Sequence, residues 1–156
     1  SSVVVCQFEV DDQTPEDLAV GLERLRELPG VLDVTQAPVF GKKGRLTVRI
    51  QVLGDVSRTD AILDKCLTET TTLGVRWHTV NRATLGRDET SHTVHGEQVR
   101  IKRAERPDGT TTRKVEMADL AAAPGGHAGR EQRRREVHAL DREDDDERPT
   151  TRGPGQ

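Results

Sequence analysis

Two adjacent carboxylates, Asp11 and Asp12, follow an apolar strand pattern and precede a predicted helix. Carboxylates at the end of a strand can bind a hard cation such as Mg²⁺, which needs few protein oxygens and keeps its phosphate ligands. The alternative is support of the helix, because negative charge is favourable near a helix N-terminus. On spacing alone the helix role is favoured, and a metal site at Asp11 and Asp12 stays a second hypothesis.

A basic turn, "GKKGR", occupies residues 41–45 between two strand patterns. Lys42 and Lys43 would act as point charges and Arg45 as a bidentate donor toward a polyphosphate. The alternative is an ordinary solvated turn. The stretch is not a Walker loop, because the glycine spacing differs and no helix follows it.

Three consecutive threonines, Thr70, Thr71 and Thr72, lead into Arg76, and two further arginines, Arg82 and Arg87, follow. Hydroxyls and guanidinium groups both donate hydrogen bonds to phosphate oxygens. The alternative is a helix-to-strand join of β-branched residues in which Gly74 relieves a tight backbone. The spacing does not decide between these interpretations.

The histidines and cysteines indicate no further chemistry. His92 and His95 are three residues apart in a predicted strand, so their side chains point to opposite faces. Cys6 and Cys66 lie on apolar faces and are interpreted as small core residues, which fits a reducing, cytoplasmic setting. No catalytic residue is assigned from the sequence.

The order of elements predicts an α+β fold that would position these stretches. Strand patterns at Val3–Val10, Val31–Phe40 and Leu46–Val52, with a fourth at 71–80, alternate with helix patterns at 14–28 and 57–70. This β-α-β-β-α-β order is the ferredoxin-like split βαβ arrangement, an antiparallel four-stranded sheet with two helices on one face. The predicted core covers residues 1–87.

The remaining chain is predicted as an extension over 88–140 and a disordered tail over 141–156. Turn residues at His95–Gly96 and Pro107–Gly109 favour a hairpin or small added sheet. A short helix is expected at 118–123, and residues 130–140 are helix-compatible but charged all round. The acidic, Pro- and Gly-rich end has too few apolar residues to form a core.

Composition excludes several classes of function. Net charge is −3 and the only aromatic residues are Phe8, Phe40 and Trp77, so neither a basic field nor base-stacking aromatics favour nucleic-acid binding. No apolar run could span a bilayer, and no signal-peptide pattern precedes Val3. Because the chain starts without Met, we expect a piece of a longer protein, with a further domain outside it.

Taken in order, the stretches "FEVDDQTPEDL", "GKKGR", "ETTTLGVR" and "RATLGR" resemble the C-terminal domain of the nickel-insertion proteins of lactate racemase maturation, the LarC family. The resemblance covers about Val3 to Arg87, and more weakly 97–137. Three places depart from the family pattern. Gln13 replaces Met after the acidic pair, Leu46 follows Arg45 where the family has Pro, and the segment near "AAAPGGHAGREQRRREV" is Gly-, Ala- and Arg-rich where the family has a cleaner helix.

The resemblance implies a ferredoxin-like domain that binds CTP with Mg²⁺ or Mn²⁺ and assembles as a homo-oligomer. The resemblance also implies the activity of that family, a cyclometallase of the lyase class. It converts CTP to CMP and pyrophosphate and inserts nickel, its substrate metal, into pyridinium-3,5-bisthiocarboxylic acid mononucleotide. Carried over by motif, Asp11 and Asp12 would lie near the divalent ion. The nucleotide-binding residues would be Lys42, Lys43, Arg45, Thr70, Thr71, Thr72, Arg76, Arg82 and Arg87. The alternative function is a non-catalytic regulatory or oligomerisation module.

Overall fold

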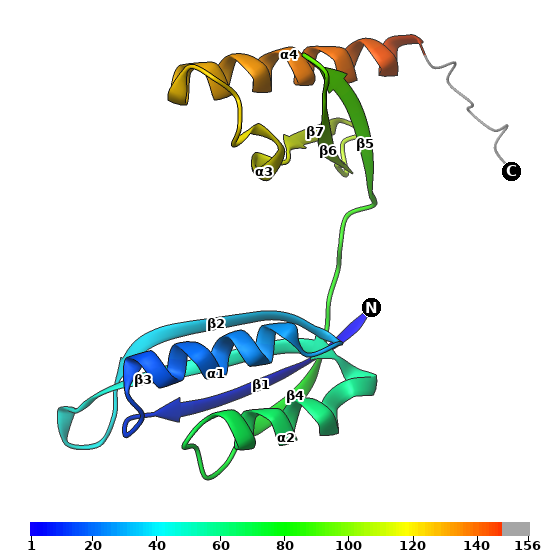
Figure 1. Cartoon of the computed structure of the whole chain (residues 1–156). Helices are drawn as coiled ribbons and strands as arrows, with labels where there is room; N and C mark the ends of the chain where they lie inside the picture. The colour runs from blue at the N-terminus through cyan, green and yellow to red at the C-terminus, as the bar shows by residue number, and fades with distance from the viewer. Residues whose placement is uncertain (148–156) are drawn as a thin grey trace, which may run out of the picture. The chain divides into compact units, whose positions relative to one another are not determined.

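The computed structural model describes residues 1–147 and divides them into two compact units, Ser1–Thr84 and Leu85 onward (Figure 1). The sequence predicts this boundary three residues later, after Arg87. Each unit has its own sheet and its own buried cluster. We therefore describe each unit by itself.

The first unit is a four-stranded antiparallel sheet with two helices. Its strands follow the order β2-β3-β1-β4, and every neighbouring pair is antiparallel. The strands are β1 (Ser2–Val10), β2 (Val31–Phe40), β3 (Leu46–Asp55) and β4 (Arg76–Asn81), and the helices are α1 (Pro15–Glu27) and α2 (Thr59–Glu69). The predicted ferredoxin-like fold is therefore confirmed.

Strand alternation builds the core of this unit. On β1, Val4, Cys6, Phe8 and Val10 are buried beneath the helices, each at most 3% exposed. Leu18, Leu22 and Leu25, which recur at helical spacing along α1, pack against them. Burial raises the pKa of Cys6 to about 11 and that of Cys66 to about 12. Both thiols therefore stay protonated at neutral pH, as expected for core residues.

Local sequence signals place the helix ends. Thr14 caps α1 by accepting a hydrogen bond from the backbone NH of Asp17, and Pro15 occupies the first turn. Gly21 allows α1 to approach the end of α2, because a Cβ atom there would lie 2.5 Å from the carbonyl oxygen of Glu69. This close approach brings the loops that precede α1 and follow α2 into contact.

The second unit is a three-stranded antiparallel sheet covered on one face by helices (Figure 1). Its elements are β5 (Arg87–Val94), β6 (Glu97–Glu105), β7 (Thr111–Val115), α3 (Met117–Leu120) and α4 (Gly126–Glu147). His95 and Gly96 both have positive φ angles, which the tight β5–β6 turn requires. Val99, Ile101 and Val137 form the centre of its core and are fully buried.

The C-terminal helix differs from the sequence prediction. α4 begins at Gly126 rather than near 130, and it continues through residues 141–147, which the sequence places in the disordered tail. The reason is tertiary: Asp141 and Asp145 form ion pairs with arginines of the sheet, so the acidic run is held against it. The short helix predicted at 118–123 covers only Met117–Leu120. The rest of the predicted tail, 148–156, lies outside the described residues.

Candidate functional site

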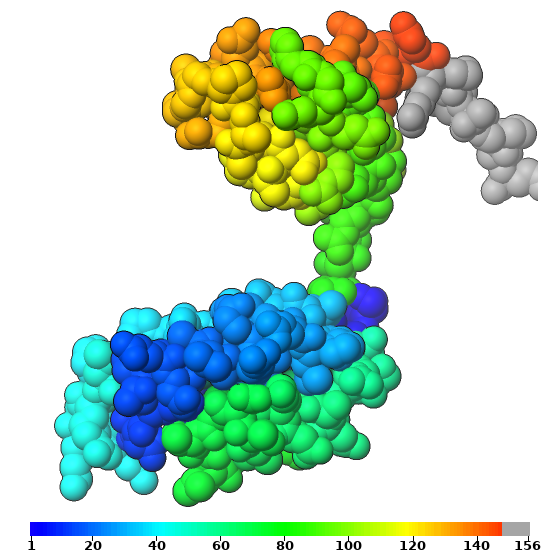
Figure 2. Space-filling view, in the orientation of Figure 1, coloured from blue at the N-terminus to red at the C-terminus, as the bar shows by residue number. Residues whose placement is uncertain are grey.

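Three loops meet at one end of the first unit, which we call the loop end: residues 11–14, 41–45 and 70–75. Because β1 runs antiparallel to both β3 and β4, its last residues lie beside the first residues of those strands. The register shows this, since Val10 pairs with Val48 and Gln7 with Arg76. Figure 2 shows the β2–β3 hairpin, in cyan, beside the blue β1–α1 loop. The fold thus gathers most of the predicted site residues from three distant parts of the sequence.

A groove of about 340 Å³ lies at the loop end, on the face of the sheet opposite the helices. Three of the predicted site residues line it: Asp11, Lys42 and Arg45. Arg45 lies 3.8 Å from Asp11, a long and exposed ion pair that contributes little to stability. The guanidinium and the carboxylate are therefore both accessible to a ligand.

Three further polar side chains line the groove, and the sequence did not single them out: Glu9, Thr47 and Arg49. Glu9 and Arg49 are directly opposite each other in the β1–β3 register. The sequence does indicate that both side chains lie on the outer face of the sheet, because both alternate with buried residues such as Phe8 and Ile50. Only the register between the two strands shows that Glu9 and Arg49 lie beside each other.

Glu9 holds two arginines of this face. Its carboxylate accepts a hydrogen bond of 2.9 Å from Arg49 Nε and two, of 3.0 and 2.8 Å, from the terminal nitrogens of Arg76. The hydrogen bonds from Arg76 are the largest cause that lowers the pKa of Glu9, and Glu9 in turn raises the pKa of Arg76. Glu9 is therefore ionised at neutral pH, and Arg76 is oriented by it.

Lys42 and Lys43 lie on a tight turn that keeps both ammonium groups exposed. Lys43 (φ 57°) and Gly44 (φ 69°) both adopt the left-handed region, and Gly41 N donates to Arg45 O at 2.8 Å. Among residues 1–147, neither lysine forms a salt bridge. Their charge is not offset by a bonded carboxylate.

The three threonines have different roles. Thr70 is buried and its hydroxyl donates to Cys66 O at 2.8 Å, which terminates α2, while Thr72 donates to Gly74 O at 2.9 Å. These two side chains fit the helix-to-strand interpretation. Thr71 instead donates to Asp12 Oδ1 at 2.5 Å and so joins the threonine block to the acidic pair.

Gln13 strengthens this connection. Its Oε1 accepts from the backbone NH of Thr71 at 3.1 Å, and its Nε2 donates to Asp17 Oδ2 at 2.7 Å and Glu69 O at 3.2 Å. The residue that departs from the resembling motif thus connects the first and third loops. It has a structural role of its own in this chain.

Arg82 and Arg87 are not part of the loop end. Arg82 follows β4 and its backbone NH donates to Ser1 O at 2.8 Å. A strand rises about 3.4 Å per residue, so this end of β1 is roughly 30 Å from Asp11. The Nε atom of Arg82 is buried and has no hydrogen-bond partner within residues 1–147. Arg87 belongs to the second unit, where it pairs with Ala104 at the start of β5.

The loop end carries more positive than negative charge. Counted together with the neighbouring strand residues Glu9, Arg49 and Arg76, it has five cations and three carboxylates, a net charge of +2. They are Lys42, Lys43, Arg45, Arg49 and Arg76 against Glu9, Asp11 and Asp12. Within residues 1–147, no group of three or more His, Cys, Asp or Glu side chains could hold a metal ion. Asp11 and Asp12 could supply at most a partial set of ligands, which suits a divalent ion that is bound mainly by phosphate oxygens.

Comparison with known proteins places these features in a family. A family model described as "Nickel insertion protein" matches residues 1–128. The pyridinium-3,5-bisthiocarboxylic acid mononucleotide nickel insertion protein of Staphylococcus saprophyticus is 33% identical over 124 residues, 79% of this chain and 31% of its own length. The protein of that name from Acetivibrio thermocellus is 39% identical over 100 residues, 63% of this chain and 24% of its own.

A solved structure agrees. It is described as LarC2, the C-terminal domain of a cyclometallase involved in the synthesis of the NPN cofactor of lactate racemase. It matches with a TM-score of 0.70 and 32% identity, over 78% of this chain and 83% of that one. This chain spans a third or less of the length of the curated relatives. No helix within residues 1–147 is long and apolar enough to cross a membrane.

Proposed function

The chain belongs to the nickel insertion protein family, and on that premise we propose that it is the CTP-binding C-terminal domain of a nickel-insertion cyclometallase. The whole protein would insert nickel into pyridinium-3,5-bisthiocarboxylic acid mononucleotide to make the lactate racemase cofactor, a lyase-class reaction. The part of the relatives' length that this chain does not span would supply the remaining domain. The loop end of the first unit would bind the nucleotide.

The observation that carries this proposal is the charge of the loop end. A nucleoside triphosphate has about four negative charges, and one bound Mg²⁺ or Mn²⁺ leaves about two. The loop end, counted with its neighbours Glu9, Arg49 and Arg76, has a net charge of +2 and also presents two adjacent carboxylates. Phosphate recognition needs cations and donors, and the phosphate-bound metal needs a carboxylate, so one site combines both requirements.

The geometry suggests a role for each group. Lys42 and Lys43, which have no bonded carboxylate among the described residues, would neutralise the terminal phosphates. Arg45 would release Asp11, since their 3.8 Å contact is weak, and would donate to a phosphate in bidentate fashion. The hydroxyl of Thr71 fixes one oxygen of Asp12, which leaves the other oxygen for the divalent ion.

Arg76 would act in an indirect manner. Its two terminal nitrogens each donate one hydrogen bond to Glu9, so its remaining donors are held in a fixed direction. Arg49 uses only Nε toward Glu9, so its terminal nitrogens stay available. Glu9 would thus orient both guanidinium groups, that of Arg49 in the groove and that of Arg76 beside it.

The test is calorimetric titration of the chain with CTP in the presence of Mn²⁺. We expect binding in the micromolar range, and Lys43→Gln should weaken it about tenfold, since a hydrogen bond between charged groups contributes about 1.5 kcal/mol. Arg24→Gln is the matched control. It removes one positive charge from the last turn of α1, at the far end of that helix, and should change the affinity less than twofold.

The absence of any heat with CTP, ATP or GTP would reject the proposal. The non-catalytic regulatory or oligomerisation module would then be the function that the fold supports. An equal loss of affinity in Lys43→Gln and Arg24→Gln would also reject the loop end as the site, because it would indicate a response to total charge alone.

A further inference from the structure

The second sheet has one face that no described element covers. α4 packs on the side of Val99, Ile101 and Val115. Because side chains alternate, Lys102 and Ala104 lie on the opposite side. Strand register places Arg87, Ala104 and Thr112 in one row across this face. Glu89, Lys102 and Lys114 form the next row.

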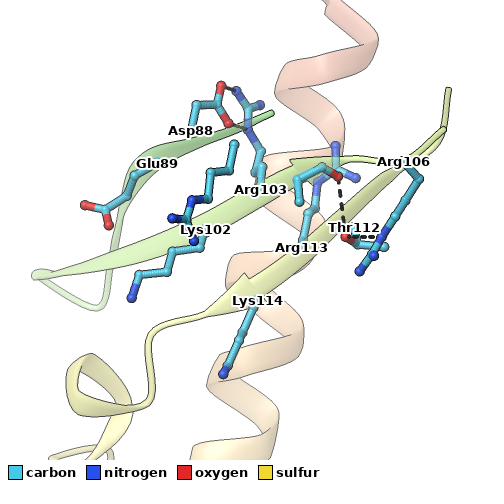
Figure 3. A pocket seen from close by; sticks show the side chains of 10 residues that line it. Asp88, Glu89, Lys102, Arg103, Arg106, Thr112, Arg113 and Lys114 are labelled. Atoms are coloured by element: carbon cyan, nitrogen blue, oxygen red, sulfur yellow. Dashed lines mark hydrogen bonds and ion pairs between the residues drawn. The ribbon is translucent and has the colours of Figure 1, made fainter. Parts of the chain in front are cut away.

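A groove of about 620 Å³ lies along these two rows, and we call it the β5–β7 groove. Its size is that of a small-molecule site. Ala104, the small residue of the first row, leaves room between Arg87 and Thr112. In Figure 3 the Arg103 guanidinium meets Asp88, and the ammonium groups of Lys102 and Lys114 extend away from that pair.

Positive charge predominates in the β5–β7 groove. Among its lining residues, the cations Arg87, Lys102, Arg106 and Lys114 and the single acid Glu89 belong to the uncovered face. Asp88, Arg103 and Arg113 form the row between them, on the face that α4 covers. A concave surface lined by charge of one sign attracts ligands of the opposite sign.

The partners of these cations differ. Arg103 is buried, the side chain of Arg113 is only 10% exposed, and both pair with carboxylates of α4. Lys102 pairs with Glu116 at 2.7 Å, and Arg106 donates to Thr112 at 3.1 Å. Arg87 and Lys114 form no ion pair or side-chain hydrogen bond with the described residues, 1–147. The groove therefore has cationic groups available to a ligand.

We infer that the β5–β7 groove binds a small molecule with several anionic groups, and that its class is the pyridinium mononucleotide. The class assignment rests on the proposed function, because the relatives' name specifies a mononucleotide with two thiocarboxylic groups. One phosphate and two thiocarboxylates would match cations on two neighbouring rows. A nucleic acid fits less well, since the groove has no aromatic side chain for stacking.

The experiment is a site-resolved NMR titration of the ¹⁵N-labelled chain with nicotinic acid mononucleotide, a pyridinium mononucleotide with one carboxylate. We expect saturable shifts at the amides of Lys102, Ala104, Thr112 and Lys114. Nicotinamide mononucleotide, which lacks the carboxylate, should bind several-fold more weakly. Affinity should fall as salt is raised, because exposed charges are screened.

Lys114→Gln should weaken binding about fivefold, the effect of one exposed ionic contact near the upper end of its usual range. The matched control is Arg135→Gln, which removes one exposed positive charge from α4, on the other side of the sheet, and should change affinity less than twofold. Lys114 is exposed, so its replacement should leave the NMR dispersion of the free chain unchanged.

Three results would overturn the inference: no saturable shifts in residues 87–114, equal weakening in Lys114→Gln and Arg135→Gln, or groove shifts caused by CTP with diamagnetic Mg²⁺ but not by the pyridinium mononucleotide. Each of these results differs from what a failure of CTP binding at the loop end would show, so the two proposals can be rejected separately. That binding is read on the same samples from the amides of 11–14 and 41–45, and Lys114→Gln should leave it unchanged.

Discussion

At the residue scale, Gln13 and Thr71 join two loops that the sequence separates by more than fifty residues. Gln13 accepts from Thr71 N, and Thr71 Oγ1 donates to Asp12. The position of the Asp12 carboxylate therefore depends on the threonine block. A methionine at 13, as in the resembling motifs, could fill the space but could not make these hydrogen bonds.

We predict that Gln13→Met lowers the free energy of unfolding of the first unit by about 1 kcal/mol, the net value of a hydrogen bond to a partly exposed group. The measurement is urea denaturation followed by Trp77 fluorescence, since Trp77 is the one tryptophan of the chain and lies in β4. CTP affinity should fall as well, because Asp12 would lose its fixed position.

Gln36→Met is the control for this prediction. Gln36 is exposed on β2, and its side chain forms no hydrogen bond with the described residues. Its replacement should leave both the urea midpoint and the CTP affinity unchanged. An unaltered midpoint in Gln13→Met would show that water replaces the bonds at no cost.

The residue types of the candidate site could be predicted from the sequence, but their grouping could not. Lys42, Arg45 and Asp11 carry a recognisable composition, and the fold brings them to one groove. Glu9 and Arg49 alternate with core residues and look like ordinary solvated strand positions until the register places them opposite each other. Arg82 illustrates the converse: it follows the threonine block closely in sequence, but it lies after β4 at the end of the sheet opposite the loop end.

At the element scale, α4 shows how buried charge can hold a polar helix. Val137, Asp141 and Asp145 are spaced four residues apart and so share one face. Asp141 is 1% exposed and accepts from Thr90 at 2.6 Å and Arg113 at 2.7 Å, with His92 at 2.9 Å. Asp145 pairs with Arg103 at 2.8 Å and also with Arg113.

The ionisation of Asp141 results from opposing effects. Burial favours its neutral form, but hydrogen bonds from Thr90, His92 and Arg113 outweigh burial and lower its pKa to about 2. The sequence predicts disorder here because composition reports only the acidic run. The partners of that run lie on strands 28 to 51 residues away, so local pattern could not reveal them.

We predict that Asp141→Asn lowers the free energy of unfolding of the second unit by about 3 kcal/mol, since it removes the more buried of the two carboxylates that neutralise Arg113. Hydrogen exchange should show the loss in α4 and β7 first. Because the native pKa of Asp141 is depressed, its stabilisation is present above the ordinary value near 4. The difference between the two proteins should vanish as pH falls through about 2.

Asp144→Asn is the matched control. Asp144 is 56% exposed and lies 3.7 Å from His92 Nδ1, so its loss should cost less than about 0.5 kcal/mol. Equal destabilisation by both substitutions would indicate that total acidic charge, rather than the buried pairs, holds the helix.

At the scale of the whole molecule, a net charge of −3 conceals an uneven distribution. The loop end and the β5–β7 groove are both positive, while acidic residues concentrate in the last turns of α4. Global charge therefore argues against nucleic-acid binding but does not report the two positive local surfaces. Each site is built within one unit, around that unit's own core.

Separate cores lead to a prediction about cooperativity. The two units have distinct buried clusters and are joined by residues 82–86, which form neither helix nor strand. Substitutions in one unit should therefore change the stability of that unit alone. In Asp141→Asn, the hydrogen-exchange protection of α4 in the second unit should be lost at lower urea, while the Trp77 fluorescence midpoint of the first unit should stay within about 0.2 M of wild type.

Gln13→Met provides the reciprocal measurement, because it should shift the Trp77 midpoint and leave the hydrogen exchange of α4 unchanged. A parallel shift of both signals in either variant would contradict independent units and show one cooperative transition. Independence would also mean that a defect at the loop end leaves the β5–β7 groove intact. The two proposed ligands could then be studied separately in the same chain.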